Sequence, residues 1–342
     1  NNNEDSLFIL GYSINLDDNL EIKLKKNIFL KSIDLINLLL VLVFIYFYFK
    51  KFFHIEKIVT TKNIVFILSL IATGLIIYLK DINLLTGLRY FRGGADGLLH
   101  EDRATMILQN LYTMNFKEAL RGGEDIYYFM PGLRYLIAFF KILFGDTSYG
   151  YILIGLFLPI TLYNLLKNLI SERIALYLII SFLFLPIFEN MGFGYFNYVH
   201  QVMRNHAETV SITIIIYSLA KISDKDFLSK TNSFDLFFTS FLLSFSVFCR
   251  PNFFPGVSLI ILYLLITHIK IHIKYALMVL LGYSFIFTSL VHNLYFGNSL
   301  SFFTKSNLHF AFDASFKNYN LANIADNIVI HQIIKWNPIY NL

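Results

Sequence analysis

The stretch NIVFILSLIATGLIIYLK, residues 63–80, decides the fold of this chain. It carries no charge before its last residue, and an apolar run of this length forms a helix that can cross a bilayer. Similar runs recur along the chain, and they predict about eight membrane-spanning helices, several of them short for a full span. We place them near residues 29–49, 63–80, 149–167, 173–188, 207–222, 235–249, 256–271 and 275–293.

The composition points to the same class of protein. Hydrophobic residues make up 56% of the 342 residues and charged residues only 15%, whereas charged residues make up about a quarter of soluble domains. We therefore expect an all-α, multi-pass integral membrane protein. The net charge of +5 requires no nucleic-acid partner, because much of the Lys and Arg lies in short loops. Cys249 is the single cysteine, which excludes an intrachain disulfide and a multi-cysteine metal site.

Positively charged residues gather in the short loops on one side of the predicted bundle. Lysines and arginines gather around residues 50–62, 167–173, 221–230 and 270–274. Such loops are typically cytoplasmic. Segments 1–28, 81–148, 189–206 and 295–342 are then external, and we expect a bacterial inner or plasma membrane with any active site facing the periplasm or exterior.

The long external loop contains the polar stretch RGGADGLLHEDRATMILQNLYTMNFKEALRGGEDIYYFMPGLRY, residues 92–135, which spells Arg-Gly-Gly followed by acids twice. Apolar residues at roughly helical spacing predict an amphipathic helix over 98–120 lying on the outer membrane surface. Residues 133–144 are typical of a second interfacial helix. Long polar loops on a membrane scaffold usually carry function.

Asp96 and His100 are the first candidate site residues in this loop. Asp96 is expected either to act as a general base for an incoming hydroxyl or to serve only as a helix cap among glycines. His100 follows one helical turn later, so the two side chains share a face. They are the candidate ligands if a divalent cation, Mg²⁺ or Mn²⁺, is bound; solvated first-turn charges are the alternative.

The second Arg-Gly-Gly segment places Glu124 and Asp125 before an aromatic run that ends at Pro131. These acids are candidates to assist catalysis or to bind an acceptor. Arg134 is a candidate phosphate ligand through a bidentate contact, and snorkelling of its side chain to the interface is the alternative.

Three further candidates lie in the external loop 189–206: His200, Arg204 and His206. Aromatic residues mixed with amides and cations suit a sugar or phosphate site, although an ordinary aromatic belt explains the tyrosines equally well. Arg250 lies at an outer helix end before Pro251, among apolar residues. A cation there is costly unless it is paired, so an anionic ligand or a structural ion pair is expected.

The order of these motifs resembles the GT-C superfamily of integral-membrane glycosyltransferases. The helix at 63–80 followed by GGADGLLHEDRA looks like the start of their shared module. The segment YYFMPGLRYLIAFFKILFGDTSYGYILI is similar to the end of their external loop, and CRPN (249–252) and HNLYFGNS (292–299) look like recurrent outer-end motifs. The resemblance covers roughly residues 63–300.

The resemblance implies transfer of a sugar from a polyprenyl-phosphate-linked donor to an acceptor hydroxyl on a glycan, lipid or protein. Asp96 matches the position of the catalytic acid. Many relatives carry paired acids there, but this sequence has Asp-Gly, so a second acid would have to be Glu124 or Asp125. Arg134, Arg204 and Arg250, with His100, His200 and His206, are then the expected donor-binding residues.

The chain divides into four segments on this basis. We expect residues 1–28 to be an external segment after a missing upstream span, and residues 29–62 to add one membrane helix and a cytoplasmic loop. Residues 63–294 form the GT-C-like module with the catalytic external loop 81–148, and 295–342 are an external segment that we expect to be truncated.

Three other classes of protein remain open. A polysaccharide polymerase or ligase shares the substrate chemistry and the multi-pass architecture. A lipid-linked-sugar flippase would need ionisable residues near mid-membrane and discontinuous helices. A non-catalytic membrane scaffold subunit would tolerate substitution of Asp96.

Overall fold

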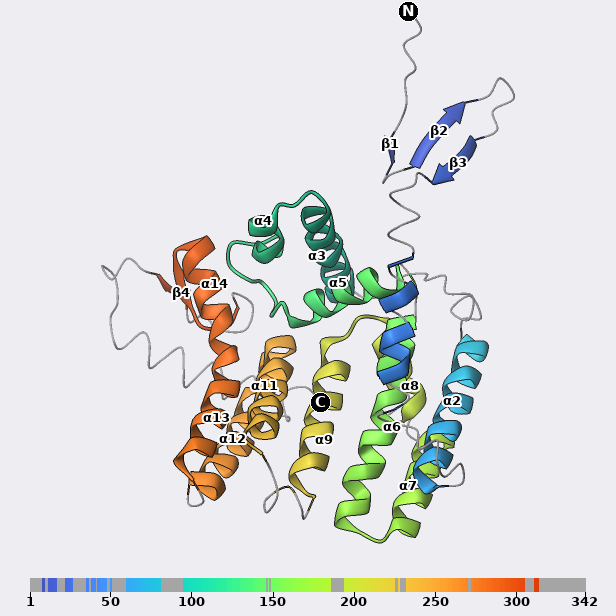
Figure 1. Ribbon diagram of the computed structural model, residues 1–342, viewed down its shortest axis with the longest axis vertical. Coiled ribbons are helices and arrows are strands. Elements are labelled where there is room, and N and C mark those ends of the chain that lie inside the picture. Colours follow the sequence, from blue (N-terminus) through green and yellow to red (C-terminus); the bar gives the residue numbers. More distant parts are fainter. Residues whose placement is uncertain are drawn as a thin grey trace, which may run out of the picture.

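The computed structural model of the chain is mostly helical (Figure 1). It describes residues 8–9, 12–16, 22–26, 35–36, 38–40, 42–47, 50, 60–80, 95–145, 147, 149–185, 194–224, 227, 232–269, 272–304 and 311–313.

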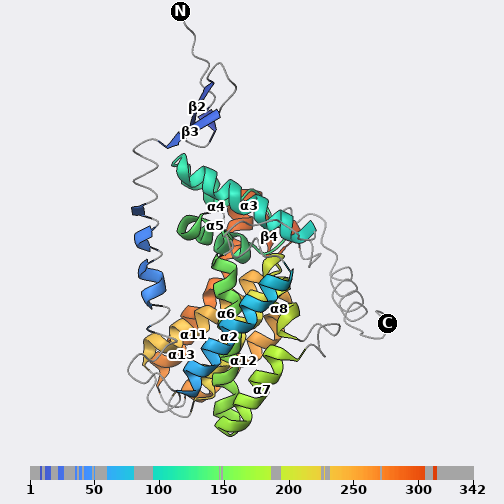
Figure 2. The same cartoon turned by 90° about the vertical axis from the view of Figure 1, so that its right-hand side faces the viewer.

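The main body is a bundle of long apolar helices (Figure 2). Its members are α2 (Thr61–Lys80), α6 (Tyr149–Leu169), α7 (Glu172–Phe184), α9 (Ala207–Ile222), α11 (Ser233–Cys249), α12 (Phe254–Ile269), α13 (Ile273–Tyr283) and α14 (Thr288–Gly297). The 3₁₀ turns Pro251–Phe253 and Ser284–Phe287 extend α12 and join α13 to α14. Each of seven predicted spans therefore coincides with one helix or with this α13–α14 pair. Within the first predicted span, an apolar helix covers Leu38–Phe47, and much of the rest lies outside the described residues.

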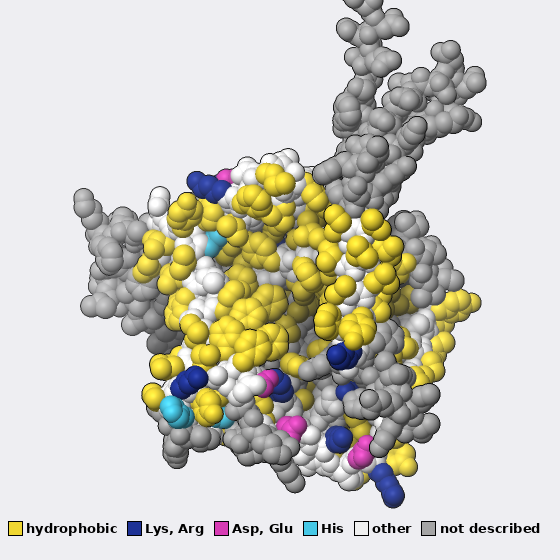
Figure 3. All heavy atoms as spheres, viewed as in Figure 1, with side chains coloured by type: hydrophobic (Ala, Val, Ile, Leu, Met, Phe, Trp, Pro, Cys, Tyr) yellow, Lys and Arg dark blue, Asp and Glu magenta, His cyan; other side chains and the backbone are white. Residues whose placement is uncertain are grey.

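Four helical segments of the described chain are long and apolar enough to cross a membrane: Thr61–Leu79, Tyr149–Leu169, Pro251–His268 and Ile273–Gly297. They agree with the prediction of a helical membrane protein. Many of their large apolar side chains face outward, among them Leu75 (50% exposed) and Leu259 (68%). Figure 3 shows a broad hydrophobic surface with charged side chains gathered toward its two ends, which suits a lipid-facing belt.

The loops predicted to be cytoplasmic lie together at one end of the bundle. Three contacts join them: the Thr61 side chain with Glu172, Asn168 Nδ2 with the Ala220 carbonyl oxygen (2.8 Å), and the rings of Phe227 and His268 (6.3 Å between centroids). The alternation read from the Lys and Arg residues thus matches the spatial arrangement. The assignment of this end to the cytoplasm stays a prediction.

Helix α7 coincides with a predicted span, and α8 (Tyr195–Met203) lies in the segment predicted to be the external loop after it. With 13 residues, α7 rises only about 20 Å, too short for a hydrocarbon core of roughly 30 Å. The first turn of α8 lies well inside the bundle: the fully buried Tyr195 bonds to Thr73 Oγ1 (2.7 Å) and donates to the Gly155 carbonyl (2.9 Å). The Phe182 and Tyr195 rings are 5.6 Å apart, so α8 begins at the depth where α7 ends.

This arrangement corrects the expectation for residues 189–206. The described part of that segment, from residue 194, is not a wholly external loop but a helix packed into the bundle. Tyr195 and Tyr198 are buried, and Tyr198 is bonded to Thr213. They are therefore neither belt residues nor sugar-stacking platforms. In the described part of this segment, the turn after α8 lies toward the end of the bundle opposite the predicted cytoplasmic loops.

Three helices cover the other end of the bundle, as both views show: α3 (Ala95–Tyr112), α4 (Phe116–Arg121) and α5 (Gly132–Phe144). The single amphipathic helix expected over 98–120 is wrong, because the chain turns at Met114, whose φ is 58°, and Asn115 caps α4. The expected helix over 133–144 is confirmed, but it is buried along one face rather than lying free on the surface. Gly132 lets it approach α11: a Cβ there would lie 2.7 Å from the Phe248 carbonyl oxygen.

Short strands complete the described structure. An antiparallel sheet has the order β1 (Phe8–Ile9), β2 (Tyr12–Leu16), β3 (Ile22–Lys26), and β4 (Ser299–Ser301) pairs with β5 (Ala311–Asp313). The fold is thus helical with small β additions, rather than strictly all-α. The boundaries predicted at residues 28, 62 and 294 stay predictions.

Candidate functional site

The second Arg-Gly-Gly segment forms a tight turn against α3. Gly122 and Gly123 both have positive φ (63° and 80°), a conformation that residues with a side chain rarely adopt. A Cβ on Gly123 would lie 2.8 Å from Cδ of Arg103. The glycine pair therefore lets the following acid meet Arg103. The first pair, residues 93–94, lies outside the described residues.

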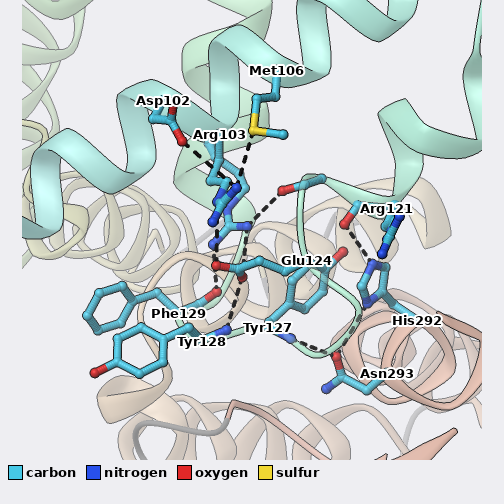
Figure 4. Close-up of polar contacts among 12 residues, drawn as sticks. Asp102, Arg103, Met106, Arg121, Glu124, Tyr127, Tyr128, Phe129, His292 and Asn293 are labelled. Carbon is cyan, nitrogen blue, oxygen red and sulfur yellow. Dashed lines mark hydrogen bonds and ion pairs between the residues drawn. The ribbon is translucent and has the colours of Figure 1, made fainter. Parts of the chain in front are cut away.

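Glu124 is held by two arginines (Figure 4). Its Oε2 accepts from Arg134 Nη1 (3.1 Å) and from the backbone N–H of Tyr128 (3.0 Å), and its Oε1 lies 3.6 Å from Arg103 Nε. Arg134 is fully buried and also donates to the carbonyl oxygens of Gly122 (2.9 Å) and Phe129 (3.2 Å). The Arg134 side chain therefore does not snorkel to the interface. The side chains of Arg134 and Glu124 both hold the loop in its conformation.

His292 and Asn293 fasten this loop to the end of the last helix. Asn293 is fully buried; its Oδ1 accepts from the Tyr127 N–H (3.1 Å), and its Nδ2 donates to the carbonyls of Ser301 and Phe303 (both 3.0 Å). The His292 ring stacks on Tyr127 at 3.8 Å. The motif HNLYFGNS thus has a structural role, which its polar residues at a buried helix end could have indicated.

Glu101 is a second structural centre, and its role was missed from the sequence. It forms an ion pair with Lys141 of α5 (2.7 Å) and accepts from Asn205 Nδ2 (2.9 Å). Asn205 is buried and left-handed (φ 57°), which Asn tolerates better than most residues. Glu101 therefore fixes the turn that carries Arg204 and His206. Its place beside Asp102, among the charged residues near the start of the helix, does not indicate such distant partners.

His100 is buried among cations. Its side chain is only 4% exposed, its Nδ1 has no hydrogen-bond partner among the described residues, and its ring lies 5.9 Å from that of Phe129. Burial, helped by the nearby positive charges of Arg134, Arg250 and His206, lowers the pKa of His100 to about 3. The ring is neutral at physiological pH, and these four residues from separate elements lie within electrostatic reach of one another.

His206 connects this group to Asp96. Burial is the main cause that lowers the pKa of His206; Arg204 and Arg250 act in the same direction, whereas Glu208 and Asp96 oppose it. The Nε2 of His206 is buried without a partner in the described part of the chain. Asp96 itself lies in the first turn of α3 with its side chain exposed. Asp96, the predicted base, therefore lies within electrostatic reach of His206, one of the predicted phosphate-binding residues.

Arg204 and Arg250 complete a group that we call the cation cluster: Arg134, Arg204, His206 and Arg250, together with the neutral His100. Arg250 forms an ion pair with Glu208 (2.7 Å), so the structural pairing weighed from the sequence is present. Each of the three arginines still has a buried Nε for which the described residues provide no acceptor. Buried N–H groups left without an acceptor are costly; an anion bound here would satisfy them.

Asp125 and His200 are the remaining candidates. Asp125 is on the surface, paired with Arg121 at 2.6 Å. His200 is partly buried in the last turn of α8. Within the described residues no group of three or more His, Cys, Asp or Glu side chains could hold a metal ion. Asp96 and His100 therefore have no third described ligand of this kind.

Comparison of the chain with protein-family models, with curated proteins and with solved structures gives no match. What the chain does is therefore inferred from its own residues. Their arrangement combines an exposed carboxylate with partly unsatisfied cations at one end of a membrane bundle. Such a site can accept a proton and hold an anion.

Proposed function

We propose that this chain is a membrane glycosyltransferase of the GT-C type, which moves a sugar from a polyprenyl-phosphate-linked donor to an acceptor hydroxyl at the outer membrane surface. The supporting observation is the cation cluster beside Asp96. The cluster is formed by residues from α3, α5, the α8–α9 turn and the end of α11. Four of its buried nitrogens have no hydrogen-bond partner in the described chain: His206 Nε2 and the Nε atoms of Arg134, Arg204 and Arg250.

The proposed chemistry follows from these roles. The acceptor oxygen forms a bond to the anomeric carbon of the sugar while the bond from that carbon to the phosphate oxygen breaks. Asp96 takes the acceptor proton, a role worth roughly 10²–10⁴-fold in rate. Arg204, Arg250 and His206 hold the departing phosphate, with His100 as a neutral hydrogen-bonding neighbour. The exposed apolar side chains of α3 and α4, such as Leu98 and Leu120, contact the lipid.

The two remaining acids take structural roles in this scheme. Both oxygens of Glu124 are engaged by arginines, and Asp125 is paired at the surface. The second acid that many GT-C relatives carry is therefore not supplied by this segment in the arrangement described. We propose that Asp96 acts without a paired carboxylate.

The test is sugar transfer from a polyprenyl-phosphate donor by the full-length protein in nanodiscs. Asp96→Asn keeps the size of the side chain but removes the basic oxygen, and it should reduce transfer about 100-fold or more. Asp102→Asn is the matched control, because Asp102 is also an exposed acid of α3 and contacts only Arg103 at 3.9 Å among its described ion pairs. Near-normal turnover by Asp96→Asn would refute the proposal.

One observation favours a second candidate, a lipid-linked-sugar flippase. The interruption between α7 and α8 gives the bundle a discontinuous membrane segment, which is typical of transporters. Movement of a labelled lipid-linked sugar across liposomes, unaffected by Asp96→Asn, would support this alternative. A polymerase or ligase would use the same site and differ in its acceptor.

A further inference from the structure

The ion pair between Arg250 and Glu208 lies within the proposed phosphate site. Arg250 directly follows α11 in an extended conformation, and Glu208 lies in the first turn of α9. Arg250 Nη2 and Glu208 Oε1 are 2.7 Å apart. The pair joins two helix ends at the outer side of the bundle.

The two partners are not held equally. The Arg250 side chain is 25% exposed and its Nε is buried without an acceptor in the described residues, whereas the Glu208 side chain is 39% exposed. A carboxylate of that exposure can turn into water at small cost, because partly exposed ion pairs contribute little net free energy. It also stays near the positive end of α9 when it turns. Arg250 is therefore the fixed partner and Glu208 the exchangeable one.

The charges around this pair indicate what Glu208 does. Arg204 and Arg250 both act on His206 as neighbouring positive charges, and Glu208 opposes them. Like charges gathered in a partly buried place repel one another. A carboxylate from the chain itself reduces that repulsion while the site holds no anion.

We propose that Glu208 is an internal competitor that determines how tightly the site binds its anionic ligand. Its carboxylate occupies Arg250 when the site is empty and is displaced when a lipid phosphate binds. A phosphate can outcompete it because it offers several acceptor oxygens to Arg250, Arg204 and His206 together. The inference deepens the proposed function and rests on it.

The experiment measures binding of polyprenyl phosphate to the full-length protein in nanodiscs of zwitterionic lipid. Glu208→Gln should bind about two- to fivefold more tightly than the wild type, the scale set by releasing a partly exposed ion pair. Glu118→Gln is the matched control, since Glu118 pairs with Arg121 at 2.9 Å and is 37% exposed. This control removes the same charge at the same end of the bundle and should leave the affinity unchanged.

Inorganic phosphate, titrated in parallel, distinguishes the headgroup from the lipid. If Glu208→Gln increases the affinity for both ligands by the same factor, the carboxylate is displaced by the phosphate group itself. Equal or weaker binding of both ligands by Glu208→Gln overturns the inference, and loss of binding in Arg250→Ala would then leave the proposed function standing. If the wild type binds neither ligand, the proposed function fails as well.

A second measurement does not depend on the variant folding. In a structure of the wild-type protein with polyprenyl phosphate bound, Glu208 should have left Arg250, with more than about 4 Å between the charged atoms, the usual limit for an ion pair. An intact Arg250–Glu208 pair beside bound phosphate overturns the inference.

Discussion

The loop around Glu124 and the cation cluster both contain buried charge, but they differ in how completely that charge is satisfied. Around Glu124, Arg134 uses both Nη atoms to bond to a carboxylate and two carbonyl oxygens, and only its Nε lacks an acceptor among the described residues. Among the other members of the cluster, Arg204 Nε and His206 Nε2 are buried without a hydrogen-bond partner in the described part of the chain. Satisfied buried charge stabilises a fold by fixing its geometry, whereas unsatisfied polar groups remain available to a ligand. We therefore interpret the loop around Glu124, with Arg134, as scaffold, and Arg204, His206 and Arg250 as the binding site.

The strongest test of this contrast is the loss of Arg134. Arg134→Met should lower the stability of the protein by about 3–5 kcal/mol, because it leaves Glu124 and two carbonyl oxygens without their buried partner. Thermal unfolding in detergent measures the change. Arg204→Met, which removes a cation from the cluster, should cost far less stability. Equal destabilisation by the two substitutions would break the comparison.

For ligand affinity, a substitution in the cation cluster should matter more than one in the scaffold. Arg204→Ala should weaken binding of polyprenyl phosphate by about 1.5–3 kcal/mol, roughly 10-fold or more, the usual value of a hydrogen bond to a charged group. Titration in nanodiscs measures it. Arg121→Ala is the control, since Arg121 is paired with two surface acids and its loss should not affect binding. An unchanged affinity in Arg204→Ala would place Arg204 in the scaffold.

The turn at Gly122 and Gly123 tests whether the loop around Glu124 contributes to the stability of the fold. Gly123→Ala should cost about 1–2 kcal/mol of stability from its positive φ alone, and the contact with Arg103 adds to this. Gly74→Ala in α2 is the matched control, because nothing lies within 4 Å of its added Cβ. Thermal unfolding of both variants measures the difference. A neutral Gly123→Ala would show that the turn is not fixed.

The smallest expected effect is the contribution of His100 to the pH dependence of the stability of the fold. The unfolded chain binds a proton near the ordinary histidine pKa of about 6.5, but the folded pKa is held near 3. Stability should therefore fall as pH decreases below 6.5, by about 1 kcal/mol between pH 6 and pH 5 from this group. His100→Gln should show a shallower slope in unfolding measured over that range. An identical slope would mean that His100 is not kept neutral by the fold.

The sequence predicted the helices well because each one is a local feature. An apolar run such as residues 63–80 must form a helix in lipid, since every backbone N–H and C=O needs a partner within the segment. Lys and Arg in the short loops indicated which helix ends lie together, and contacts such as Asn168 with Ala220 bear this out. The break in the helix at residues 113–115 and the buried start of α8 were not predicted, because tertiary packing decides them.

Sequence reasoning also named the polar residues of the site, but it could not separate their roles. Asp96, Glu124 and Asp125 look alike as acids after Arg-Gly-Gly, and Arg134 and Arg204 look alike as cations near the outer surface. Whether a charge is satisfied depends on partners far away in the chain, such as Asn205 for Glu101, 104 residues apart. Short-range pattern determines which segments enter the membrane. Long-range contacts alone decide which charges hold the fold together and which remain available to a ligand.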